Sequence, residues 1–180
     1  SYERSFRHDR ESLIRMFRKH LINETAFQEM LEEESIFWVD DLDLASSMVI
    51  KTIKSINEED DEVEILPVWR NDDDDKEFMD GLFTQTLAQG ETNEKLIEEG
   101  AQNWELERIA LIDRILMKMA LAEAKSFESI PLKVTLNEYI ELSKYYSTEK
   151  SHGFINGILD QLFTKLSESG DIKKTGRGLI

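Results

Sequence analysis

The fold of this chain is decided by residues 104–160, which read WELERIALIDRILMKMALAEAKSFESIPLKVTLNEYIELSKYYSTEKSHGFINGILD. Good helix formers dominate this stretch, and a break at Ile130-Pro131 ends its first helical pattern. We predict helices over residues 105–126 and 132–146, and a last helix that Ser147 or Thr148 caps and Gly170 ends. Its core positions follow helical spacing. They are Ile155, Ile158, Leu159, Leu162 and Leu166.

Helical patterns continue outward from this stretch toward the N-terminus. Apolar residues at helical spacing predict helices over residues 9–34, 41–56, 75–89 and 92–100, the third stopping at Gly90. The chain has only two prolines and eight glycines, and no sustained alternation of apolar and polar residues indicates a sheet. The sequence therefore predicts an all-α fold of about seven helices.

The central predicted helix, residues 105–126, carries two apolar stripes. The first consists of Leu106, Ile109, Ile112, Leu116 and Met119, and the second of Leu111, Ile115 and Ala122. Such a helix lies between other helices, so its charged residues must share a narrow exposed edge. These residues are Glu107, Arg108, Asp113, Arg114 and Lys118. A bland interpretation is an ordinary solvated edge with local charge pairs.

The net charge of −16 argues against nucleic-acid binding, but the charge is unevenly spread. Residues 1–20 carry six Lys or Arg against three acids, whereas residues 57–75 carry ten acids and one Arg. Local patches decide what a surface binds. The arginines at 7, 10 and 18 can share one side of a helix, either as a basic binding face or as the solvated face of an amphipathic helix.

Several classes of function find no support in the sequence. There is no cysteine, no phosphate-binding glycine loop and no H-E-x-x-H motif, and no apolar run approaches the roughly 18 residues of a membrane span. No signal peptide opens the chain. We therefore expect a cytoplasmic protein that is no enzyme and has no cofactor, metal or membrane partner.

Gly157 stands inside the last predicted helix, where glycine costs about 1 kcal/mol relative to alanine. Something must offset that cost. Close packing against another helix is the plainer interpretation, and approach of a ligand's backbone is the functional one.

Many positions of residues 104–160 agree in order and spacing with the C-terminal half of the NusB family of transcription antitermination factors. The stretch closely resembles that family, which implies a compact helical bundle of NusB type. The positions that carry the resemblance are Trp104, Leu106-Glu107-Arg108, Asp113-Arg114, Ile115-Leu116, Ala120-Leu121, Glu123, Ile130-Pro131, Val134, Asn137-Glu138, Glu141-Leu142, Lys144, Ser151 and Phe154 to Asp160.

The resemblance implies two binding surfaces. In the family, RNA lies beside the start of the last helix, where the aromatic at Phe154 contacts it; Phe154 in a plain core position is the alternative. The RNA-binding candidates are Lys150, Ser151, His152, Phe154, Asn156, Arg7, Arg10 and Arg18. In the family, the edge of the central helix helps to bind the ribosomal protein NusE. The partner-binding candidates are Glu107, Asp113, Arg114 and Lys118.

We divide the chain into an N-terminal helical segment (1–56), an acidic linker (57–75), a NusB-like helical domain (76–168) and a flexible basic tail (169–180). The resemblance implies an adaptor that binds single-stranded boxA-type RNA together with NusE. It would act through the RNA polymerase complex to promote ribosomal RNA transcription. Two alternatives stay open: the RNA-binding domain of a ribosomal RNA methyltransferase, and a helical module that binds only proteins.

Overall fold

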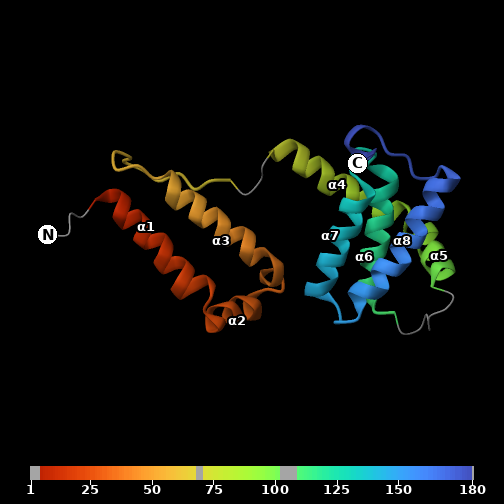
Figure 1. Cartoon of the computed structure of the whole chain (residues 1–180), viewed down its shortest axis with the longest axis horizontal. Coiled ribbons are helices and arrows are strands. Elements are labelled where there is room, and N and C mark those ends of the chain that lie inside the picture. The colour runs from red at the N-terminus through yellow and green to blue at the C-terminus, as the bar shows by residue number, and fades with distance from the viewer. Residues whose placement is uncertain (1–4, 68–70, 102–108, 180) are drawn as a thin grey trace. The chain divides into compact units, whose positions relative to one another are not determined.

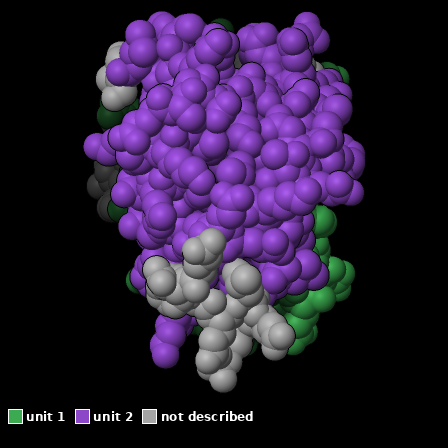
Figure 2. All heavy atoms as spheres, turned by 90° about the vertical axis from the view of Figure 1, so that its right-hand side faces the viewer, with its two compact units in different colours: residues 1–70 green, residues 71–180 purple. Residues whose placement is uncertain are grey.

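The computed structural model describes residues 5–67, 71–101 and 109–179, which form eight α-helices in two compact units, 1–70 and 71–180. The all-α prediction is confirmed, with one helix more than the seven expected. No helix among the described residues has the length and apolar character needed to cross a membrane. Figure 1 shows the helices, and Figure 2 shows the atoms of the two units in different colours.

Unit 1 contains α1 (Phe6–Phe17), a π-helical turn η1 (Arg18–Ile22), α2 (Thr25–Glu34) and α3 (Trp38–Ser55). The prediction of one helix over residues 9–34 is wrong, because the chain leaves helical geometry at Asn23 and Glu24. The Asn23 amide donates to the Arg18 carbonyl at 2.9 Å. Such a side chain competes with the backbone for hydrogen bonds and favours a break in a helix.

Arg10 holds α1 against the end of α3. Its guanidinium donates to the carbonyls of Lys54 at 3.2 Å and Ile56 at 2.8 Å, and it lies 5.8 Å from the centroid of the Phe6 ring. The last carbonyls of a helix lack partners within the helix, so a cation there is stabilising. Beyond α3, the acidic segment has no regular structure up to Pro67, and the Leu66 amide donates to Thr52 Oγ1.

Unit 2 is built around α6 (Leu111–Ser126), which contacts α4 (Asp72–Ala88), α5 (Gly90–Gly100), α7 (Leu132–Tyr146) and α8 (Ser151–Ser169). The prediction for residues 132–146 is confirmed to the residue. All five predicted core positions of α8 are buried, and Gly170 ends that helix with a left-handed φ of 81°. Gly90 begins α5; the stop after α4 lies at Gln89.

The central helix is shorter and less enclosed than the sequence predicts. Ala110 is extended, with a ψ of 144°, so the helix begins at Leu111 and cannot continue from residue 105. Residues 102–108 lie outside the described residues. Leu116, Met117 and Leu121 are buried, whereas Leu111 is 72% exposed and Ile115 is 40% exposed. Both predicted apolar stripes therefore reach solvent near the N-terminus of α6, since Ile112 of the first stripe is also 38% exposed and Leu111 and Ile115 belong to the second.

The C-terminal segment packs against unit 2, so the prediction of a flexible tail is wrong. Ile172 joins the buried core, the Lys174 ammonium donates to the Phe127 carbonyl at 2.9 Å, and the Thr175 amide donates to the Glu128 carbonyl. Residues 176–179 then form a 3-10 turn. The basic residues suggested a solvated tail, but one apolar anchor and these hydrogen bonds hold it in place.

A buried polar pair links α6 to α7. The Tyr139 hydroxyl donates to Glu123 Oε2 at 3.0 Å, and both side chains are buried. Burial, together with the neighbouring Glu123 carboxylate, raises the pKa of Tyr139. The hydroxyl therefore stays protonated in the folded chain under alkaline conditions that ionise it in the unfolded chain.

This pair predicts a loss of stability at high pH that Tyr139→Phe removes. Above pH about 10, the unfolded chain releases the tyrosine proton and the folded chain keeps it, so the free energy of unfolding falls. Urea unfolding between pH 8 and 11 should show a steeper decline in wild type than in the variant. Lys125 and Lys174, whose pKa values burial lowers, are present in both proteins and cancel in the comparison. Parallel declines would contradict the prediction.

Candidate functional site

The start of α8 is fixed by a buried carboxylate on α6. Asp113 is 4% exposed and Ser151 is 3% exposed. The Ser151 hydroxyl donates to Asp113 Oδ2 at 2.8 Å, and the Ser147 hydroxyl donates to Oδ1 at 2.5 Å. Asp113 also lies in the first turn of α6, where the helix dipole favours a negative charge. This one residue therefore joins α6 to the connection between α7 and α8.

These contacts correct two predictions. Asp113 does not lie on an exposed edge, because its carboxylate is enclosed by two serine hydroxyls. Neither Ser147 nor Thr148 caps α8, because the residue at the cap position is Lys150 and no side chain caps the helix. The Thr148 hydroxyl instead lies 2.8 Å from Ser151 Oγ. The hydroxyls of this connection order the turn that precedes α8.

The outer face of α8, residues 152, 153, 156 and 157, is exposed and smooth. His152 and Asn156 are its polar side chains, and Lys150 is exposed just before the helix. A Cβ added at Gly153 or at Gly157 would meet no atom of the described residues within 4 Å. The interpretation of Gly157 as a helix-packing position is therefore wrong, since none of the described helices packs against this face of α8. An outside backbone can approach the helix closely there.

Phe154 lies between the core and solvent. Its side chain is half-buried and packs against the hydrophobic core of unit 2. The two interpretations of this residue, core position and RNA contact, are therefore not exclusive: part of the ring packs inside and part is accessible. Ser151, in contrast, is buried and points inward to Asp113, so the prediction that it contacts RNA is wrong.

Two residues of the predicted partner-binding edge of α6 form ion pairs with Glu94 of α5. Arg114 Nη1 lies 3.0 Å from Glu94 Oε1, and the Lys118 ammonium pairs with Oε2 of the same carboxylate. These three side chains are between 21% and 32% exposed, so they are accessible but already paired. Glu107 lies outside the described residues. Sequence reasoning missed Leu111 and Ile115, whose exposed side chains lie on the same helix, because it assigned their stripe to the core.

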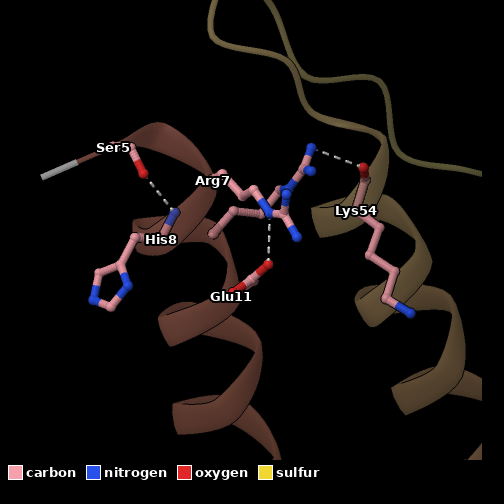
Figure 3. Close-up of polar contacts among 6 residues, drawn as sticks. Ser5, Arg7, His8, Glu11 and Lys54 are labelled. Atoms are coloured by element: carbon pink, nitrogen blue, oxygen red, sulfur yellow. Dashed lines mark hydrogen bonds and ion pairs between the residues drawn. The ribbon is translucent and has the colours of Figure 1, made fainter.

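The N-terminal arginines have separate roles. Arg7 pairs with Glu11 one turn along α1, with Nε 3.0 Å from Oε1 (Figure 3). Arg10 is used to hold the end of α3, as described above. Arg18 is exposed in η1 and has no ion-pair partner within the part of the chain that the structure describes. Of the three arginines predicted to form one basic face, Arg18 is therefore the one best placed to contact a ligand.

Comparison with known proteins adds an independent line of evidence. The sequence pattern of the NusB family matches residues 43–164. The chain is similar to "Transcription antitermination protein NusB" of Salinibacter ruber, with 46% identity over 105 residues, 58% of this chain and 66% of that protein. It is also similar to the proteins of the same name from Chloroherpeton thalassium and Natranaerobius thermophilus, with 40% and 32% identity.

Those two matches span 50% and 67% of the relatives and 58% and 52% of this chain. The matching stretch therefore covers only about half to two thirds of the relatives' own length. Among solved structures, the chain is similar to Thermotoga maritima NusB ("T. maritima NusB, P3121, Form 2"), with 23% identity, coverage of 93% of this chain and 96% of that chain, and a TM-score of 0.46.

Proposed function

Since the chain belongs to the NusB family, we propose that it is a cytoplasmic transcription antitermination factor that binds single-stranded boxA-type RNA together with the ribosomal protein NusE. In this proposal it acts through the RNA polymerase complex to promote ribosomal RNA transcription. Family membership agrees with the prediction that the chain is no enzyme. The structural observation that carries the proposal is the open outer face of α8.

That face has the properties that a single strand of RNA requires. Gly153 and Gly157 let a sugar-phosphate backbone approach the helix, and Asn156 offers both hydrogen-bond donors and an acceptor. Lys150 supplies a positive charge beside the first turn. The accessible part of the Phe154 ring can stack on an unpaired base, an interaction worth about 1–3 kcal/mol.

The protein partner would occupy the N-terminal part of α6. Leu111 and Ile115 provide exposed apolar area, and the Glu94 cluster with Arg114 and Lys118 provides charges beside it. An apolar patch next to charged groups is the usual composition of a protein interface. A partner bound there also adds RNA-binding surface, so two weak sites act at high effective concentration.

The proposal is tested by fluorescence anisotropy of a labelled boxA-containing RNA, with and without NusE, at two salt concentrations. We expect salt-sensitive binding that is tighter with both proteins than with NusE alone. Gly157→Leu should weaken RNA binding at least tenfold, because the side chain blocks the open face, while the helix keeps its stability.

Ser167→Leu is the matched control, since it adds the same side chain at an exposed position of α8 ten residues away, roughly 15 Å along the helix. This variant should bind RNA like wild type. If RNA binding with NusE equals that of NusE alone, the adaptor proposal is wrong. A stable complex with NusE that does not bind RNA would instead indicate a module that binds only proteins.

A further inference from the structure

Unit 1 contains a groove lined by positive charge, between η1 and α3. Its volume is about 440 Å³. One stripe of α3, spaced by three or four residues, forms one wall with Ser46, Ile50 and Lys54, and Lys51 lies on the same side. Arg18 lines the opposite wall from η1. We call this the basic groove.

In the part of the chain that the structure describes, the cations of the basic groove have no carboxylate close enough to form an ion pair. Neither Arg18 nor the Lys54 ammonium has a carboxylate within 4.0 Å among the described residues, and the Lys51 ammonium contacts only Met48 Sδ at 3.8 Å. Asp43 is the one acid among the described residues that line it.

In a chain of net charge −16, three cations are thus gathered around one groove without partners. Holding like charges together costs free energy unless an anion joins them. Lys54 has a second relevant feature: its side chain extends along α3, away from its own carbonyl oxygen, which Arg10 contacts (Figure 3). Arg10 therefore holds the backbone beneath Lys54 and leaves the ammonium to the groove.

The floor of the groove also suits an anion. Ser46 is 6% exposed, and no hydrogen bond of its hydroxyl is found among the described residues; Ile50 is 8% exposed beside it. A hydroxyl at the base of a groove and lysine or arginine side chains at its rim are the groups that contact phosphate oxygens of nucleic acids.

We propose that the basic groove binds consecutive phosphates of a single-stranded RNA, as a phosphate-binding site separate from the open face of α8. This inference rests on the proposed function, because RNA is the polyanion which that function supplies. The groove contacts the backbone and not the bases, so it contributes affinity and salt dependence without selecting a sequence.

The test compares two variants of the full chain that each remove two positive charges from unit 1. Lys51→Gln with Lys54→Gln changes the basic groove, whereas Arg15→Gln with Lys19→Gln changes exposed cations that do not line it. Binding of a labelled 12-nucleotide oligouridylate and of the boxA RNA is measured by anisotropy between 50 and 200 mM salt. Circular dichroism checks that both variants fold.

Each phosphate contact on a single strand contributes about 0.7 to the slope of log affinity against log salt. The groove variant should therefore lose about 1.4 from this slope with both RNAs, so that wild type weakens roughly sevenfold more than the variant over this salt range. The control variant should keep most of the slope.

Equal slopes in the two variants would contradict the proposal that the basic groove binds phosphates, without affecting the adaptor proposal. Absence of RNA binding by wild type, with and without NusE, would overturn both. Polyglutamate is the competitor that separates RNA from an acidic protein. If it displaces oligouridylate as well as unlabelled RNA of equal charge does, the groove is a site for acidic chains in general and the assignment to RNA is wrong.

Discussion

Asp113→Ala should lower the free energy of unfolding of unit 2 by about 3 kcal/mol. Each hydrogen bond to a charged group contributes about 1.5–3 kcal/mol, and the substitution removes the acceptor of the Ser147 and Ser151 hydroxyls together. It also leaves Ser151 buried without its carboxylate partner, which adds a desolvation cost. Urea unfolding followed by circular dichroism gives the stability. Hydrogen exchange over residues 147–156 shows whether the start of α8 loosens.

The matched control is Asp160→Ala, which removes an exposed aspartate of α8 and should change stability by less than about 0.5 kcal/mol. If Asp113→Ala is as mild as this control, Asp113 does not hold the start of α8. The same variant also connects stability to function. Because Ser151 adjoins the outer face of α8, loosening that turn should weaken RNA binding without altering any residue of the face.

This carboxylate shows why the sequence alone could not define the site. A charged residue on a helix is predicted to face solvent. The sequence therefore predicts that Asp113 belongs to the exposed charged edge of α6. Its partners lie 34 and 38 residues further along the chain. Only the packing of α6 against the α7–α8 connection brings them together, and no local pattern carries that information.

The parts of the fold with strong local signals were predictable. Pro131 fixes the start of α7, and Gly170 ends α8 because a left-handed residue is needed there. The apolar spacing of α8 identified its core positions correctly. Helical periodicity did not reveal the break near Asn23. A side-chain hydrogen bond favours the end of the helix there, although the apolar pattern continues on both sides.

Apolar periodicity also cannot say whether a second apolar stripe is covered. Leu111 and Ile115 follow the same spacing as buried residues of α6, yet both are exposed. The residues of the open face of α8 came from resemblance to the family, not from periodicity. That resemblance did not separate Ser151, which the helix turns toward Asp113, from His152 and Asn156, which are exposed.

Gly178→Ala should release the C-terminal segment from unit 2 and lower its stability by about 2 kcal/mol. A Cβ at this position would clash with the Glu128 carbonyl oxygen, a backbone atom that cannot easily move. Undocking exposes Ile172, whose burial is worth about 1.5–3 kcal/mol, and breaks the hydrogen bonds of Lys174 and Thr175. The conformational entropy that the released segment regains offsets part of this loss of stability.

Hydrogen exchange is the decisive measurement, because the amides of Thr175 and Gly178 donate hydrogen bonds in the docked segment, to the carbonyls of Glu128 and Thr175. They should exchange much faster in the variant, while α8 stays protected because Gly170 still ends it. Gly153→Ala is the matched control: a Cβ there meets no atom within 4 Å in the described part of the chain, so stability should not fall. Unchanged protection of the Thr175 and Gly178 amides in Gly178→Ala would mean that the segment docks without needing this glycine. Faster exchange would show that a stretch whose composition suggests a free basic tail is part of the packed domain, held by one isoleucine and one close backbone approach.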